Sequence, residues 1–184
     1  MGKFAMFILK LFGWKIEDRP QEVDKCVVVM GPHTSNWDFI IGRLAFAYYG
    51  VNGHYLIKKE LFFFPLGWFL KSIGGIPVDR KRKGKGKGES MTEVAVRHFK
   101  ENDKMYMVFT PEGTRSYNPK WKKGFYYIAL EAKVPILIGF MDYEKKIGGF
   151  HSMITPSGDV DKDIQHIKNI LKNYKGKYPE KGID

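Results

Sequence analysis

The chain has 184 residues, enough for one domain with a sizeable hydrophobic core. Its 31 Lys and Arg against 20 Asp and Glu leave a net charge of +11, which favours an anionic partner such as nucleic acid, an anionic membrane surface or a phosphorylated substrate. The one cysteine, Cys26, excludes an internal disulfide, and its place at the start of an apolar strand favours a packed thiol over a reactive one.

The N-terminal segment is amphipathic. Its longest uncharged run, Phe4 to Leu9, is far shorter than the roughly 20 residues that span a bilayer, and no small-residue cleavage site of a signal peptide accompanies it. We expect residues 1–17 to form a helix that lies in the membrane interface; the alternative is a helix docked on the core. The expected apolar stripe, with the lysines at its edges, comprises Phe4, Phe7, Ile8, Leu11 and Phe12 with Lys3, Lys10 and Lys15.

His33 and Asp38 follow the first apolar strand, Val27 to Met30, and the turn pair Gly31-Pro32. The carboxyl end of a buried strand is the usual place for catalytic groups in α/β proteins. A carboxylate that accepts a proton from one ring nitrogen holds a histidine in one tautomer, as a general base requires. Side chains five residues apart point about 140° apart on a helix, so the two meet only if His33 lies in the turn and Asp38 in the first helical turn. The alternative is a capping aspartate beside a histidine packed at a strand end.

A helix from Phe39 to Tyr49 and a strand from Gly53 to Lys58 are predicted next. The most apolar stretch of the chain, residues 61–70, follows and is interrupted by Pro65 and Gly67, so it cannot form a transmembrane helix. We expect a core segment there. The alternatives are a second membrane-dipping surface and the wall of a pocket for an apolar ligand.

Another short strand leads to Asp79 and Arg80, and the basic, glycine-rich run 81–88 comes directly after it. This run is expected to form a solvated loop or to contact lipid headgroups or an acidic protein partner. Its glycine spacing does not match a nucleotide-binding phosphate loop. Ser90 and Glu93 then form a capping-box pattern that opens a helix ending at about Lys100.

The segment Pro111-Glu112-Gly113-Thr114-Arg115 follows an apolar strand, Met105 to Phe109. It combines a turn that glycine permits, a hydroxyl donor and a bidentate guanidinium, which are the parts of a cradle for an oxyanion or a phosphate.

The rest of the chain predicts a helix at 125–133, a strand at 134–140, a hairpin turn at 147–150 and a helix at 161–175. Strands and helices alternate, with one late hairpin. This order predicts an α/β fold: a single-domain sandwich with a mixed, largely parallel sheet flanked by helices, preceded by the amphipathic N-terminal helix.

Three motifs in this order, His33 to Asp38, Gly74 to Arg80 and Pro111 to Ser116, resemble the first three motifs of the glycerolipid acyltransferases, the family that contains 1-acyl-glycerol-3-phosphate acyltransferase. The resemblance runs from about residue 27 to residue 140. It implies that His33 is the general base that takes the proton of the acceptor hydroxyl and that Asp38 orients it. It also implies a set of residues that bind the acceptor, chiefly its phosphate: Arg80, Glu112, Gly113, Thr114 and Arg115.

Val134 to Leu137 resembles the start of the fourth motif of this family, an apolar strand assigned to the acyl side. The family usually has a second proline where this chain has Ile138, and that departure bears on acyl-chain selection.

The resemblance implies an O-acyltransferase of phospholipid biosynthesis that moves a fatty acyl group from acyl-CoA or acyl carrier protein to a lysolipid hydroxyl, most simply that of 1-acyl-glycerol-3-phosphate. Other lysolipid acceptors, including amino-acid-based ones, stay open. Direct attack in a ternary complex is expected, with no metal or other cofactor. Ser35 is a less favoured nucleophile because no Gly-x-Ser-x-Gly elbow surrounds it.

The expected partners are the lysolipid, the thioester donor and a membrane surface, but not nucleic acid. Residues 18–184 form the expected acyltransferase domain, held peripherally or monotopically at the cytoplasmic face of the cell membrane. A function of a different class also fits the charge: a non-catalytic basic module that binds nucleic acid or acidic lipid.

Overall fold

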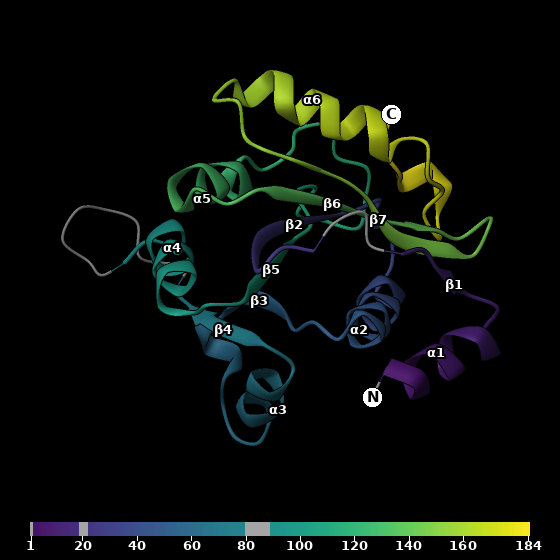
Figure 1. Ribbon diagram of the computed structural model, residues 1–184, viewed down its shortest axis with the longest axis horizontal. Coiled ribbons are helices and arrows are strands. Elements are labelled where there is room, and N and C mark those ends of the chain that lie inside the picture. Colours follow the sequence, from purple (N-terminus) through teal and green to yellow (C-terminus); the bar gives the residue numbers. More distant parts are fainter. Residues whose placement is uncertain (1, 19–21, 80–88) are drawn as a thin grey trace.

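A computed structural model describes residues 2–18, 22–79 and 89–184 (Figure 1). Arg80 and the basic run 81–88 lie outside these residues. The described helices are α1 (Gly2–Leu11), α2 (Trp37–Tyr49), α3 (Leu66–Ser72), α4 (Met91–Glu101), α5 (Gly124–Ala132) and α6 (Val160–Leu171), with short 3-10 turns at Lys59–Leu61 and Pro179–Lys181. The described strands are β1 (Lys15–Ile16), β2 (Lys25–Gly31), β3 (Gly53–Lys58), β4 (Gly75–Val78), β5 (Met105–Phe109), β6 (Ile136–Asp142) and β7 (Ile147–Ile154).

The described strands form one sheet in the order β1-β7-β6-β2-β5-β3-β4. β2 lies at its centre and pairs in parallel with β5 and β6, so that Val27 lies beside both Met107 and Ile136. β6 and β7 form the antiparallel hairpin. The predicted mixed, largely parallel sheet is therefore confirmed.

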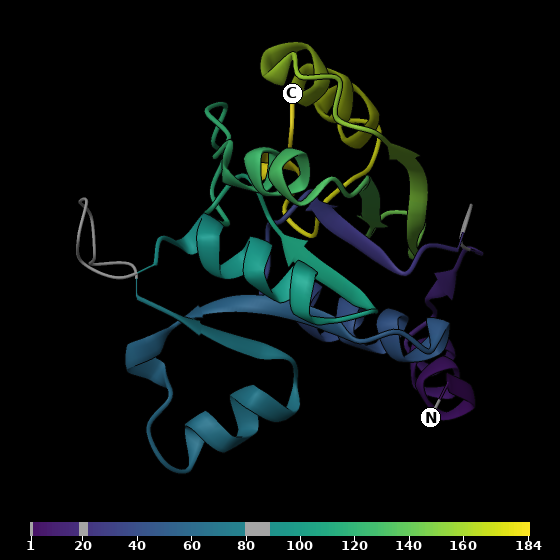
Figure 2. The same ribbon diagram turned by 60° about the vertical axis from the view of Figure 1, so that its left-hand side comes forward.

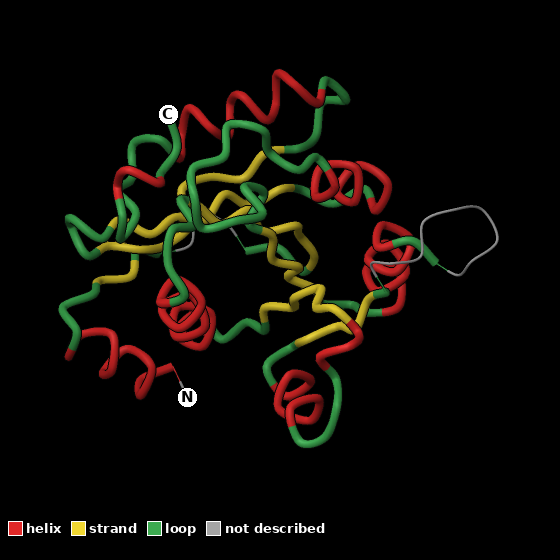
Figure 3. The backbone as a smooth tube through the Cα atoms, turned by 180° about the vertical axis from the view of Figure 1, so that it is seen from behind, coloured by secondary structure: helices red, strands yellow, loops and turns green. Residues whose placement is uncertain are grey.

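Helices cover both faces of the sheet, and α1, α2 and α3 lie on the opposite side from α4, α5 and α6 in all three views (Figures 1, 2 and 3). The strand β2 shows why: Val27 and Val29 pack with residues of α4, α5 and α6, whereas Cys26 and Val28 pack with residues of α1 and α2. A central parallel strand that is buried on both faces reads as a continuous apolar run. The predicted sandwich is confirmed, and Cys26 is a packed thiol.

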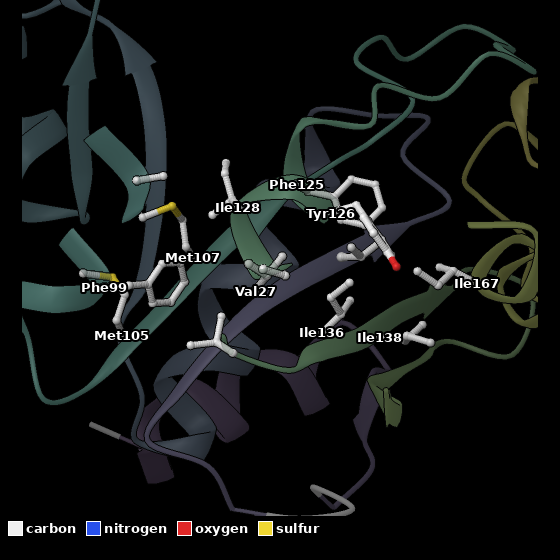
Figure 4. Close-up of a cluster of buried hydrophobic side chains, with 14 of the residues drawn as sticks. Val27, Phe99, Met105, Met107, Phe125, Tyr126, Ile128, Ile136, Ile138 and Ile167 are labelled. Carbon is white, nitrogen blue, oxygen red and sulfur yellow. The ribbon is translucent and has the colours of Figure 1, made fainter. Parts of the chain in front are cut away.

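The larger half of the core lies between the sheet and α4, α5 and α6 (Figure 4). Phe125, Tyr126 and Ile128 of α5 are almost completely buried there, as are Ile136 of β6 and Ile167 of α6. Helix α4 begins with the predicted capping box, in which Ser90 Oγ accepts the Glu93 N–H and the Glu93 carboxylate accepts the Ser90 N–H.

The predicted hairpin turn at 147–150 is wrong by a few residues. The chain turns at 143–146, where Lys146 has a φ of 50°, and residues 147–150 belong to β7. The glycines of that segment permit close packing instead of a turn, because a Cβ on Gly149 would lie 3.1 Å from Cβ of Glu17 and 3.2 Å from the Tyr49 hydroxyl oxygen.

The predicted helix at 161–175 ends earlier, at Leu171. Beyond that end, the ring of Tyr174 stacks on Phe140 with the centroids 4.0 Å apart, and the carbonyl of Lys175 accepts the Tyr143 N–H at 2.8 Å.

The expectation that residues 61–70 form a core segment is wrong. Phe64 is 91% exposed and Trp68 is 76% exposed, whereas Gly67 is buried. A Cβ on Gly67 would lie 2.7 Å from the Phe62 backbone, so α3 turns its small residue inward and its aromatic residues outward.

Helix α1 packs on the core through one face and exposes the other, and its placement in a membrane interface stays a prediction. Ala5 and Leu9 are buried on the α2 side, while Phe4, Phe7 and Leu11 are exposed. None of the described helices has the length and apolar character needed to cross a bilayer.

Candidate active site

His33 and Asp38 meet at the carboxyl end of β2, the central strand. Nδ1 of His33 lies 3.0 Å from Oδ2 of Asp38. His33 follows the strand in a loop and Asp38 lies in the first turn of α2, which is the arrangement required by their five-residue spacing. The carboxylate can only accept a hydrogen bond, so Nδ1 carries the proton and Nε2 is left as the basic nitrogen.

The Asp38 carboxylate is buried, with 3% side-chain exposure, and its loop supplies it with donors. Oδ2 also accepts the backbone N–H groups of Thr34 and Ser35, each at 2.9 Å. Ser35 Oγ accepts the Trp37 N–H at 3.2 Å, so this side chain, and not that of Asn36, bonds to the first turn of α2.

A further donor to Asp38 comes from outside the loop. Tyr143 follows β6 directly, and its hydroxyl donates to Oδ1 of Asp38 at 2.5 Å. Burial and this bond to the carboxylate raise the pKa of Tyr143. The sequence analysis missed Tyr143; its only signal there is a position directly after a buried strand.

Glu112 lies behind the loop that carries His33, and its predicted part in acceptor binding stays a prediction. Its side chain is buried, and Oε1 accepts the backbone N–H of His33 at 3.0 Å. Burial raises the pKa of Glu112 to about 7. A buried carboxyl group that faces the loop of His33 is suited to holding that loop.

Gly113, Thr114 and Arg115 lie at the surface, unlike Glu112. Gly113 has a φ of 68°, and a Cβ there would lie 2.5 Å from Cε of Lys122, so this turn depends on glycine. Nη1 of Arg115 donates to Oδ1 of Asn36, which ties the loop after β5 to the loop after β2.

These residues border a cleft of about 850 Å³ that also includes His33 and is lined by both polar and apolar side chains. Asp79, the last described residue before Arg80, lines the cleft as well. Lys122 adds a further positive charge to the lining, whereas Lys123 pairs with Asp161.

His33 also lines a second cavity, of about 300 Å³, between α2 and the sheet. Its walls are mainly apolar and include Phe39, Gly42, Phe46 and Val108. A Cβ on Gly42 would meet no atom within 4 Å among the described residues, so the glycine leaves space on the face of α2 that borders the pocket. The sequence did not predict this pocket; the one signal is a glycine within an apolar helix.

No group of three or more His, Cys, Asp and Glu side chains arranged to hold a metal ion occurs in residues 2–18, 22–79 and 89–184. The His33 ring is hydrogen-bonded to the buried Asp38 carboxylate, an arrangement that would suit a general base.

A model of the acyltransferase family matches residues 15–138. An uncharacterised acyltransferase of Schizosaccharomyces pombe is 35% identical over 136 residues, which cover 68% of this chain and 46% of that protein. The 1-acyl-sn-glycerol-3-phosphate acyltransferase epsilon of Mus musculus is 33% identical over 100 residues, which cover 53% of this chain and 27% of that protein. The chain thus spans less than half the length of these curated relatives.

The crystal structure of the 1-acyl-sn-glycerophosphate (LPA) acyltransferase PlsC from Thermotoga maritima has a similar fold, with a TM-score of 0.65 and 19% sequence identity. The match covers 94% of this chain and 75% of that chain. This likeness supports the observed α/β architecture.

Proposed function

This chain belongs to the acyltransferase family, and on that premise we propose that it transfers a fatty acyl group from acyl-CoA or acyl carrier protein to the hydroxyl of a lysolipid, most simply 1-acyl-glycerol-3-phosphate. The observation that carries the proposal is the position of His33, which lines both the cleft that holds Arg115 and Lys122 and the mainly apolar pocket under α2. Transfer between an acyl thioester and a lipid headgroup needs a base where two such volumes meet.

In the proposed reaction, Nε2 of His33 takes the proton of the acceptor hydroxyl, and the hydroxyl oxygen attacks the thioester carbonyl. The tetrahedral intermediate then expels the thiolate, which receives the proton from the His33 imidazolium. The Asp38 carboxylate stabilises that imidazolium and keeps the ring oriented. A base placed in this way contributes roughly 10²–10⁴-fold to the rate.

The cleft supplies the charge expected of a site for an anionic headgroup. Thr114, Arg115 and Lys122 line it, and a guanidinium binds phosphate or carboxylate in a bidentate manner. Arg80 lies outside the described residues and stays a predicted acceptor ligand. The pocket under α2, which holds Phe39 and Phe46, is the proposed site of the acyl chain.

The test of this assignment is acyl transfer in mixed micelles, with both donor types, to lysophosphatidic acid, to uncharged lysolipids and to amino-acid-based lysolipids. We expect transfer to an anionic acceptor and, in Arg115→Ala, a KM for that acceptor raised by roughly tenfold or more, since a charge-assisted pair is lost. An unchanged KM would contradict the role of Arg115. If the protein transfers an acyl group to none of the acceptors, the proposed reaction is wrong and the non-catalytic binding module is left.

We also propose that the protein docks on the cytoplasmic face of the cell membrane, peripherally or monotopically, through α1 and the segment 61–72. Phe4 is 70% exposed and Leu11 is 72% exposed on α1, next to the exposed Lys3 and Lys10. Apolar side chains bordered by lysines are typical of interfacial helices.

The segment around α3 has the same character. Phe63, Phe64 and Trp68 are exposed, and the exposed Lys58 and Lys71 lie at either end of this segment in the chain. Helices α1 and α3 project from the same side of the molecule, with α2 between them (Figures 1 and 3).

Flotation with vesicles tests this docking. We expect Phe64→Ser combined with Trp68→Ser to weaken binding to anionic vesicles, whereas Tyr127→Ser, at an exposed aromatic residue of α5 on the opposite side, should leave binding unchanged. Equal binding by all three proteins would contradict the proposed surface.

A further inference from the structure

Within the part of the chain that the structure describes, the Asp38 carboxylate receives four hydrogen bonds, and one of them comes from outside its own loop. The donors from His33, Thr34 and Ser35 belong to the same short loop as Asp38. The Tyr143 hydroxyl comes from a residue 105 positions further along the chain, on the turn between β6 and β7. It is the donor to Oδ1, while the other three share Oδ2.

Tyr143 is itself held by neighbouring elements. Its backbone N–H donates to the Lys175 carbonyl at 2.8 Å, beyond the end of α6. Its ring meets Trp14 edge-on, with centroids 4.9 Å apart, and Trp14 is buried directly after α1. The turn that carries it is fixed by Asp142, whose Oδ1 accepts the Lys145 N–H at 3.0 Å.

We propose that Tyr143 is a positioning residue for the proposed acyl transfer, which holds the Asp38 carboxylate in the orientation that accepts the Nδ1–H of His33. The inference rests on the proposed function of the His33 site. A carboxylate can rotate about its side-chain torsion. The three donors to Oδ2 all belong to one loop, and loops are more mobile than the strands that they connect. The bond to Oδ1 joins that carboxylate to a sheet hairpin, so the orientation of the base depends on β6 as well as on β2.

The hydrogen bond from Tyr143 also changes the negative charge on the Asp38 carboxylate. A hydroxyl that donates to a carboxylate withdraws negative charge from it, so less of that charge is left to stabilise the imidazolium of His33. Removal of the hydroxyl therefore favours the protonated ring and moves the acid limb of the activity profile to higher pH. Among the described residues, the charged or titratable residues near the pair include Asp79, Glu112, Arg115, Lys122, Asp142 and Lys175. They are the same in the parent and in a Tyr143 variant, so a comparison of the two isolates the hydroxyl.

The variant Tyr143→Phe tests the proposal because it keeps the ring against Trp14 and removes only the donor. We expect kcat to fall by about three- to tenfold, the KM for the acceptor to change less than about twofold, and the acid limb of the kcat profile to move up by about half a pH unit. The matched control is Tyr106→Phe, whose hydroxyl donates to the Val23 carbonyl and not to Asp38. It loses a tyrosine hydrogen bond as well, but its pH profile should not move.

An NMR titration of the His33 ring protons supplies a readout that does not depend on activity. The midpoint should move upward in Tyr143→Phe and stay in place in Tyr106→Phe. A parent protein without acyl transfer would refute the proposed function, and the titration would still test the positioning role. If neither the titration nor the pH profile moves in a folded Tyr143→Phe protein, the proposal is overturned, even where kcat has fallen.

Discussion

Glu112 makes the stability of this protein depend on pH in a direction opposite to that of a paired surface carboxylate. Its side chain is 5% exposed, and Oε1 accepts the His33 N–H. Oε2 is buried without a hydrogen-bond partner among the described residues. Burial raises the pKa of Glu112 from 4.5 to about 7, so the folded protein holds this proton more tightly than the unfolded chain does.

The size of the effect follows from the pKa difference between the two states. Each pKa unit corresponds to about 1.4 kcal/mol, so a rise from 4.5 to about 7 corresponds to about 3 kcal/mol. Below pH 4.5 both states are protonated and the contribution is fully present. As the pH rises to about 7 the unfolded state releases the proton first, and the free energy of unfolding falls.

The variant Glu112→Gln isolates this contribution, since its amide oxygen can still accept the His33 N–H but does not titrate. Urea unfolding of the parent and the variant at about pH 5 and about pH 8.5 gives a double difference that cancels all other titrating groups. We expect the parent to lose about 2.5 kcal/mol more than the variant between these values, because at pH 5 the unfolded chain has already released part of this proton. The exposed Glu131→Gln is the control and should follow the parent. If Glu112→Gln also follows the parent, the buried carboxylate does not titrate as argued.

Three further predictions follow from the site and the core. Asp38→Asn should lower kcat by roughly 10²–10⁴-fold, because a neutral amide does not stabilise the imidazolium; steady-state kinetics with near-parent kcat would contradict this. Gly42→Leu should fill part of the apolar pocket and shift the preferred donor toward shorter acyl chains, and an unchanged ranking across a chain-length series would refute the pocket assignment. Ile167→Ala should cost about 2–5 kcal/mol in urea unfolding, since the side chain is completely buried, and a cost well below that range would contradict its place in the core.

The elements that were predicted well are those fixed by local chemistry. The strand Met105–Phe109 and the capping box of Ser90 are set by residues within one short segment, and both appear as expected. The contact between His33 and Asp38 could also be predicted from the sequence, because a five-residue spacing leaves few geometries that join the two side chains.

The features that were missed depend on residues far apart in the chain. Hydrophobicity alone favoured burial of residues 61–70, but the close approach of Gly67 to Phe62 turns the aromatic side chains outward. Gly149 resembled a turn residue, but it lies in a strand, where the absence of a side chain lets Glu17 and Tyr49 pack closely against the backbone. In the same way, no local pattern links Tyr143 to Asp38, since the hairpin and the sheet order bring them together.

The most direct test of the central claim is the rate of acyl transfer to 1-acyl-glycerol-3-phosphate in mixed micelles by the parent protein, His33→Ala and His166→Ala. His166 is an exposed residue of α6, so the control carries the same substitution away from the cleft. We expect His33→Ala to lose at least about 10²-fold in rate while it stays folded, and His166→Ala to keep the parent rate. Transfer that persists undiminished in His33→Ala, or a parent protein that transfers no acyl group from either donor, would contradict the assignment of His33 as the general base.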